Sequence, residues 1–453
     1  MEPNCIASDV ISSLPQEIVE IILSFVPTKH AVRTSILSKK WRYSWTRIPK
    51  LVFVEKSMIK AKMRKVLDAI PQVLSMHQGS ILEFSLNMYS DDGNVEVDFD
   101  KIITYLSRKN SVTKLTLKLV SFNMRIMLPL SLFSLHQLTD LYLTCCKLDH
   151  QPPVNGFGML TSLSLIDVDS TEELILDIVS KSPLLKNFSM KIDDYDDSCQ
   201  FSHASMCELF GYIPAIERLY LSVHLYEFES SLPKLLTPLV HLKYVRLHDK
   251  CYIRKSGLSF FVFLIRSSPN LEKLKLQMRC LDSYEDDTDI DALTLEEYSD
   301  IWWGHLKELE VFLTYYADDE LPELEYLKLI LARSPVLKEL NILISDDEFE
   351  KGAETKVLGV ISNFKRASDT VKITVLLYTA DVVLTVDEIY KVALKSLGPN
   401  IPGQIFETLS TPKHGDASYE TFLRESKGIL GLLRKRAQIM TKGVSSDPIR
   451  YDM

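Results

Sequence analysis

The sequence predicts an α/β protein in which a short helical module precedes a long array of stacked strand–helix units. Two observations carry this prediction. A densely apolar stretch with helical periodicity lies near the N-terminus, and one apolar pattern recurs ten times after it. With 453 residues, 46% of them hydrophobic and 25% charged, the chain has the composition of an ordinary globular protein. Its length allows two or three domains or one extended array.

The segment 13–49 has the periodicity of three short helices. The apolar residues of the first helix recur at spacings of three and four, at Leu14, Ile18, Ile21, Ile22 and Phe25. Ala31 and Ile36 share one face of the second helix, and Trp41 and Trp45 stand at i and i+4 on the third. This is more apolar surface than three small helices can bury among themselves. Either the following domain covers it, or another protein docks on it.

The recurring pattern is an apolar residue, two others, an apolar residue, one other and an apolar residue. Its ten copies start at Ile81, Val112, Leu138, Leu160, Leu185, Ile216, Leu242, Leu271, Leu306 and Leu337. Successive copies begin 22 to 35 residues apart, and helical stretches lie between them. We therefore expect an irregular leucine-rich-repeat solenoid, with one strand per turn and helices on its convex side.

The N-terminal segment resembles the F-box of plant F-box/leucine-rich-repeat (LRR) proteins. The residues that carry this resemblance are Leu14-Pro15, Glu17, Ile18, Pro27-Thr28-Lys29, Val32, Thr34-Ser35, Leu37-Ser38-Lys39 and Trp41-Arg42. From His305 to Val375 the chain also resembles the FBD segment of such proteins, through HLKELEVFL, LEYLKLILARSPVLKELNI and VKITVLL. The resemblance implies a three-helix F-box that binds the Skp adaptor of a cullin-based ubiquitin ligase.

Four domains follow from the pattern and the resemblance together. We assign residues 12–50 to the F-box, 51–304 to leucine-rich repeats, 305–378 to FBD-like terminal repeats with a capping strand, and 379–453 to a C-terminal extension of unassigned role. The residues that the resemblance suggests for adaptor binding are Leu14, Pro15, Ile18, Ile22, Val32, Ser35, Leu37, Lys40 and Trp41.

The charge distribution favours an acidic partner for the N-terminal region. The net charge is −9, yet twelve Lys or Arg and a single acid, Glu55, lie between Lys29 and Lys65. This basic stretch is either a surface for an acidic adaptor or a solvated helix face. We do not expect nucleic acid binding, because the basic residues alternate with an apolar pattern and no nucleic-acid motif accompanies them.

Several other classes of protein are disfavoured. The seven cysteines have no regular spacing, and the N-terminus lacks a cationic segment followed by an apolar core. The longest apolar run, Leu258 to Ile265, is too short to span a membrane. We therefore expect the nucleus and/or the cytoplasm. No phosphate loop, nucleophile motif or metal-ligand pair is found, so we expect no catalysis, no cofactor and no metal.

The strand pattern also predicts where a target binds. Side chains alternate along a strand, so residues between the inward leucines point to the concave side. On neighbouring strands this places together six basic and aromatic residues, the type that most often carries interface energy: Arg218, Tyr220, Tyr244, Arg246, Lys273 and Lys275. The alternative is ordinary polar cover on an exposed sheet.

The leading hypothesis is a non-catalytic interaction protein. The resemblance implies the substrate-recognition subunit of an SCF-type (Skp-cullin-F-box) ubiquitin ligase, which contacts a cullin through the adaptor and binds a target protein on the repeats. An alternative of a different class is a receptor for a small signalling molecule or polyanion that completes the target-binding face. The sequence does not identify the target protein.

Overall fold

The structure is a mixed α/β arrangement of helices and a long parallel sheet. The computed structural model describes residues 14–37, 39, 41–55, 60–90, 99–121, 126–150, 157–192, 201–222, 235, 237–249, 255–278, 302–313, 323–345 and 353–378. They divide into two compact units. The first contains the described residues of 14–53 and 75–81, and the second contains the remainder.

The first unit is built from short helices. Its elements are α1 (Gln16–Ser24), α2 (Thr28–Arg33), the 3-10 turns η1 (Thr34–Ile36) and η2 (Ser44–Arg47), and the beginning of β1 (Lys50–Glu55). Pro15 and Pro27 immediately precede α1 and α2, with φ of −53° and −52°. Because proline fixes φ and lacks an N–H, it suits the position just before a helix. Val19, Leu23 and Ala31 are fully buried in this unit.

The third predicted helix is not an α-helix. Around Trp41 and Trp45 the backbone bonds join residues three apart: Ser44 N donates to Trp41 O at 3.3 Å, and Thr46 N donates to Tyr43 O at 3.1 Å. The sequence WRYSWT is rich in aromatic and hydroxyl residues, which are weak helix formers, so tertiary packing decides its conformation. Both tryptophans are buried, and their spacing therefore reflects core packing in 3-10 turns.

A segment distant in sequence completes the first unit. His77 Nε2 lies 2.9 Å from Ile48 O, and Gln78 N donates to Thr46 O at 2.8 Å. At Gly79 the approach is close enough that an added Cβ would lie 2.9 Å from Arg47 O. Residues 75–81 are thus part of the N-terminal unit, although the predicted F-box ends at residue 50.

The second unit contains a long parallel sheet whose strands follow one another in chain order. They are β2 (Glu83–Ser90), β3 (Lys114–Ser121), β5 (Asp140–Thr144), β7 (Ser162–Ile166), β8 (Asn187–Lys191), β9 (Arg218–Ser222), β10 (Tyr244–Asp249), β11 (Lys273–Met278), β12 (Glu308–Leu313), β13 (Glu339–Ser345) and β14 (Lys372–Tyr378). Two short strands, β4 (Ile126–Met127) and β6 (Cys146–Lys147), form a separate pair.

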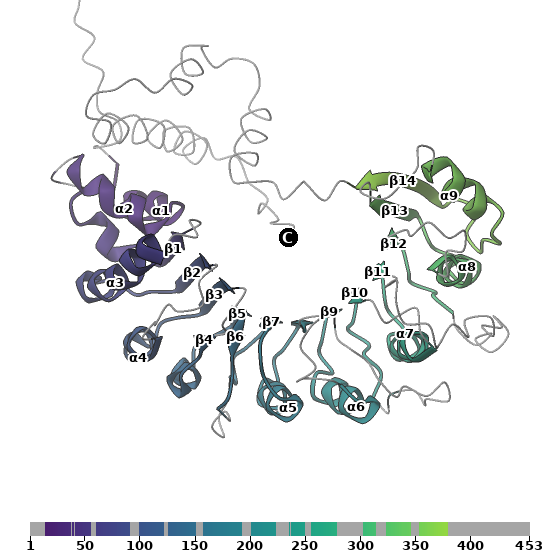
Figure 1. Cartoon of the computed structure of the whole chain (residues 1–453), viewed down its shortest axis with the longest axis horizontal. Helices are drawn as coiled ribbons and strands as arrows, with labels where there is room; N and C mark the ends of the chain where they lie inside the picture. The colour runs from purple at the N-terminus through teal and green to yellow at the C-terminus, as the bar shows by residue number, and fades with distance from the viewer. Residues whose placement is uncertain are drawn as a thin grey trace, which may run out of the picture. The chain divides into compact units, whose positions relative to one another are not determined.

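Helices cover one side of this sheet. Besides α3 (Lys60–Met76), they are α4 (Phe99–Lys109), α5 (Glu172–Ser180), α6 (His203–Tyr212), α7 (Lys255–Ser267), α8 (Glu323–Arg333) and α9 (Ala353–Ser362), with the 3-10 turn η3 (Leu130–Ser134). Figure 1 shows α4 to α8 on the same side of the strands. We call the opposite side the helix-free face, since none of these described helices lies on it.

Each of the ten predicted strands is present, and β14 is the terminal strand predicted near residue 375. The last two apolar residues of every copy of the pattern point into the core, as at Leu219 and Leu221, which are both 0% exposed. The residue between them lies on the helix-free face, where it is buried at Ser164 and half-buried in the other copies. The alternation of apolar and polar residues therefore predicts both where each strand lies and which of its side chains point into the core.

Three of these helices end next to a Ser-Pro pair. α5, α7 and α8 stop just before Ser182, Ser268 and Ser334. Ser182 Oγ donates back to Ile178 O at 2.9 Å, and Ser268 Oγ donates to Leu264 O at 2.7 Å. These hydroxyls satisfy carbonyls that a helix terminus would leave unpaired, which allows the chain to turn directly into the next strand.

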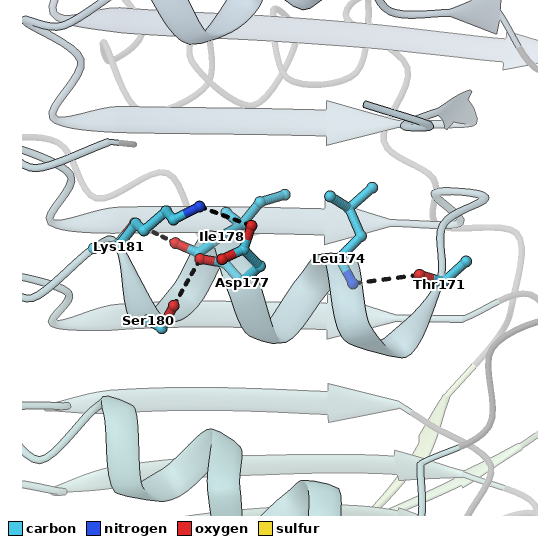
Figure 2. A network of polar contacts seen from close by, with 7 residues as sticks. Thr171, Leu174, Asp177, Ile178, Ser180 and Lys181 are labelled. Atoms are coloured by element: carbon cyan, nitrogen blue, oxygen red, sulfur yellow. Dashed lines mark hydrogen bonds and ion pairs between the residues drawn. The ribbon is translucent and has the colours of Figure 1, made fainter. Parts of the chain in front are cut away.

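Helix α5 shows how a unit of the array is fixed at both ends (Figure 2). At its start, Leu174 N donates to Thr171 Oγ1 at 3.3 Å. At its end, Lys181 Nζ lies 2.9 Å from Asp177 Oδ2, and Ser180 Oγ donates to Asp177 O at 2.9 Å. The cap depends on a single side chain, that of Thr171, so a substitution of this residue tests its contribution to stability.

We expect Thr171→Ala to lower the free energy of unfolding by about 1 kcal/mol, because the amide of Leu174 loses its acceptor. Chemical denaturation of the full chain measures this change. The matched control is Lys181→Met, which removes the half-buried i, i+4 pair of the same helix and should cost only about 0.2–0.5 kcal/mol. A larger loss from the control than from Thr171→Ala would contradict the capping role.

Candidate interaction surfaces

The first candidate surface is an apolar stripe on α1. Ile18, Ile21 and Phe25 are spaced three and four residues apart, which places them on one face of the helix, and Leu14 lies just before its N-cap, Pro15. Ile21 is 39% exposed and Phe25 is 57% exposed, while Leu14 and Ile18 are half-buried. The neighbouring face, with Val19 and Leu23, is the one that packs into the unit. We call these four residues the α1 stripe.

The structure divides the predicted adaptor-binding residues into two groups. Pro15 is exposed, and five others are half-buried: Leu14, Ile18, Val32, Ser35 and Leu37. Ile22 and Trp41 are core residues, 3% and 2% exposed, so their role is to pack in the interior of the unit and not to contact a partner directly. Lys40 lies outside the described residues. The predicted extension 379–453 also lies outside them.

Sequence reasoning did not select the most exposed apolar residues of this unit. Besides Ile21 and Phe25, these are Ile36 at 63% and Tyr43 at 64% exposure. Ile36 ends η1 and Tyr43 immediately precedes η2. Helical periodicity does not predict the facing of residues in 3-10 turns, because the rotation per residue differs from that of an α-helix.

The second candidate surface lies on the helix-free face of the sheet, where the predicted residues align. Arg218 and Lys273 flank Tyr244 in register, and Tyr220 and Lys275 flank Arg246 in register. All six predicted target-binding residues thus occupy two adjacent rows on β9, β10 and β11. The register follows because each strand presents its leucines at the same position of the pattern.

Arg246 and Tyr220 form a stacked pair on this face. The guanidinium carbon of Arg246 lies 5.1 Å from the centroid of the Tyr220 ring. Burial raises the pKa of both Tyr220 and Tyr244, although the positive charge of Arg246 opposes the shift. Both phenols therefore stay protonated at neutral pH and can donate hydrogen bonds to a partner.

A second pair of the same type lies on β3 and β5, and its tyrosine is three strands from Tyr220 in the sheet order. Lys118 Nζ is 4.8 Å from the centroid of the Tyr142 ring. Burial raises the pKa of Tyr142 as well, with a smaller contribution from the negative form of Tyr220. Tyr142 and Tyr220 belong to the same row of register partners, and the residues between them in this row are the small Ser164 and Ser189.

The two lysines of the predicted surface differ from its arginines. Lys275 Nζ lies 3.0 Å from Glu310 Oε1 on the next strand, and Lys273 is paired with Glu308 in the same way. The hydrogen bond with Glu308 raises the pKa of Lys273, with burial opposing. The positive charge expected on β11 is therefore largely balanced by β12, whereas that on β9 and β10 is not.

The described residues contain no candidate membrane span and no candidate metal site. Within them, no helix is both long enough and apolar enough to cross a bilayer. No group of three or more histidine, cysteine, aspartate or glutamate side chains is arranged to bind a metal ion in the same ranges.

Two family models match the N-terminal segment and the earlier part of the strand array, which ends before β9. The F-box domain family model matches residues 11–53, which include the α1 stripe. A second family model, described as FBD-associated F-box protein At5g56370, LRR repeats, matches residues 99–210 within the strand array. The chain is similar to plant F-box/FBD/LRR-repeat proteins. The resemblance of the N-terminal segment to an F-box is thereby confirmed.

Individual relatives extend the similarity over most of the chain. The F-box/FBD/LRR-repeat protein At1g13570 of Arabidopsis thaliana is 27% identical over 411 residues, covering 80% of this chain and 96% of that protein. The FBD-associated F-box protein At4g10400 of the same plant is 25% identical over 354 residues, covering 76% and 79%. F-box proteins with LRR repeats are generally non-catalytic adaptors.

Matches of a different kind are to two aminotransferases of the same plant. Glutamate–glyoxylate aminotransferase 2 of Arabidopsis thaliana is 59% identical to this chain over 64 residues. The match covers 14% of this chain and only 13% of that enzyme. So small a share of the enzyme does not imply its activity here. It does show that one short part of the sequence is similar to a protein outside the F-box family.

Proposed function

We propose that this protein is the substrate-recognition subunit of an SCF-type ubiquitin ligase. In this proposal the N-terminal unit is the F-box that binds the Skp adaptor, and the strand array is a leucine-rich-repeat solenoid that binds a target protein. The observation that carries it is the α1 stripe. An exposed apolar helix face lies within the segment matched by the F-box family model, where docking on a partner would bury it.

The proposed contribution to ubiquitin transfer is proximity. This chain binds a target on its helix-free face and an adaptor on its N-terminal unit. The assembly therefore brings the target to a ubiquitin-loaded enzyme, and this protein itself catalyses no reaction. The predicted boundaries at residues 50, 304 and 378 remain part of the proposal, as does the expected place of the assembly in the nucleus and/or the cytoplasm.

The direct test is reconstitution of the assembly. The purified full chain should co-elute with a Skp adaptor and recruit a cullin through it, as measured by size-exclusion chromatography. Native mass spectrometry of the same sample would reveal a retained small molecule, which is the outcome expected from the receptor alternative. Failure to bind any Skp adaptor would overturn the proposed function.

The target-binding part of the proposal has its own prediction. Replacing Tyr220 and Arg246 together by Ala should reduce affinity for a bound target at least about tenfold, because stacked aromatic and arginine side chains are typical binding hot spots. Adaptor binding should be unchanged. The matched control is the double variant Tyr142→Ala with Lys118→Ala, which removes the other stacked pair of this face. Equal losses from both variants would place the site elsewhere or over the whole face.

A further inference from the structure

Neither arginine of the predicted surface, Arg218 or Arg246, has an acid as its register partner on the neighbouring strands. In register, Arg218 lies between Asn187 and Tyr244, and Arg246 lies between Tyr220 and Lys275. Among the described residues, no carboxylate is within ion-pair distance of either guanidinium. Arg218 is exposed and Arg246 is half-buried. Two positive charges with no ion-pair partner among the described residues raise the local potential and attract negative groups.

The same two rows show what such cations bind. On the adjacent strands, Lys273 and Lys275 are each paired with a glutamate of the neighbouring strand, Glu308 and Glu310. In these two rows the cations of β11 are therefore paired with carboxylates of β12, whereas the cations of β9 and β10 have no carboxylate as a register partner. A partner that supplies acidic side chains there would complete the pattern, and a guanidinium can bind a carboxylate through two parallel hydrogen bonds.

A third row of the face becomes apolar toward the C-terminal strands. Phe312, Leu343 and Leu376 are successive register partners on β12, β13 and β14. Leu376 is 49% exposed, and the other two are half-buried. On earlier strands the same row contains polar residues, including His248 and Gln277. We call the three apolar residues the apolar strip.

We propose that the helix-free face binds an extended segment of the target that carries acidic side chains followed by apolar ones. The acidic side chains pair with Arg218 and Arg246, and the apolar ones cover the strip. Strands are about 4.8 Å apart, so the strip begins about 10 Å and ends about 19 Å from β10. An extended peptide spans these distances in about three to six residues.

Glutamates near the apolar strip make the face selective for a particular order of acidic and apolar residues in the bound segment. Glu308, Glu310 and Glu339 stand on β12 and β13 in the two rows next to the strip. Glu308 and Glu310 are paired with Lys273 and Lys275, so the exposed Glu339 contributes most of the repulsion. It disfavours a segment that is acidic throughout, because like charges brought together at an interface are destabilising. The preferred segment is therefore acidic at one end only. This inference rests on the proposed target-binding role of the face.

Synthetic peptides of about fourteen residues on a Gly-Ser background test the proposal. The probe carries two glutamates followed, about three to six residues later, by two leucines, and its binding to the full chain in complex with the Skp adaptor is measured by fluorescence polarisation. We expect affinity at least about tenfold above that of peptides in which the glutamates become glutamine or the leucines become serine.

Variants of the protein locate the bound peptide. Arg218→Gln with Arg246→Gln should lower the affinity for the probe at least about tenfold, and Leu376→Ser should lower it by a smaller factor. The controls remove an exposed cation and an exposed leucine elsewhere in the second unit: Lys114→Gln on β3 and Leu130→Ser in η3. Both controls should bind the probe like the parent chain.

Three results would overturn the proposal: no preference for the probe over its neutral or serine forms, equal loss in the control variants, or tighter binding of an all-glutamate peptide. A phosphoserine peptide that binds at least about tenfold better than the glutamate probe would reject the carboxylate as the recognised group. Adaptor binding is measured in the same samples. If the chain does not bind the adaptor, the proposed function is rejected. If it binds the adaptor but not the peptide, only the inference about the target segment is rejected.

Discussion

A chain carrying Ile21→Ser and Phe25→Ser should lose at least about a hundredfold in affinity for the Skp adaptor. Burying an isoleucine or phenylalanine side chain contributes about 1.5–3 kcal/mol, so the two together contribute about 3–6 kcal/mol. Because the two side chains are 39% and 57% exposed, the substitutions remove little of the unit's own core. Calorimetric titration of adaptor into the purified full chain measures the loss.

Two comparisons make this result interpretable. Leu130→Ser removes a residue of similar exposure, 56%, from the second unit and should leave adaptor affinity unchanged. Ile22→Ala, by contrast, removes a core residue and should lower the thermal stability of the N-terminal unit. If the Ile21 and Phe25 variant bound the adaptor like the parent chain, the α1 stripe would not be the docking surface.

The largest expected effect on stability comes from the aromatic cluster between α6 and α7. The ring centroids of Phe210, Phe260 and Phe263 lie 6.3 to 6.5 Å apart, and all three side chains are at most 1% exposed. Phe263→Ala leaves a cavity where two other rings lose contact, so we expect a loss of about 3–5 kcal/mol. That is a large part of the stability of a typical domain.

Urea denaturation followed by far-UV circular dichroism measures this loss. Phe25→Ala is the matched control, because it removes the same side chain from an exposed position and should change stability by less than about 1 kcal/mol. In an array that unfolds unit by unit, the Phe263 variant should also show a second transition at lower urea concentration. A single unshifted transition would contradict the contribution of the cluster.

Much of the second unit was predictable because its signal is repeated. Each copy of the apolar pattern contains the period of a strand, and the same positions of successive copies lie in register in a parallel sheet. The rows that place Tyr220 beside Arg246 and Arg218 beside Tyr244 could therefore be read from the sequence. The pairing of Lys275 with Glu310 follows from the same rows, because the two residues are register partners on β11 and β12.

The facing of α1 was predicted only in part. Ile18, Ile21 and Ile22 lie within one arc of a helix, and periodicity does not say which edge of that arc meets the core. The structure buries Ile22 and exposes Ile21, because the rest of the unit packs on the Val19 and Leu23 side. The sequence alone also gave no sign that residues 75–81 return to this unit, since their contacts are to backbone atoms.

That return has a consequence for the order in which the protein matures during synthesis. The carbonyls of Thr46 and Ile48 receive their contacts from Gln78 and His77, about thirty residues later in the chain. At about 5–20 residues per second, the N-terminal unit waits a few seconds for its last segment to be made. During this interval a nascent chain has α1 and α2 but not the completed unit, and an adaptor that requires the finished surface would bind only after residue 81 is available.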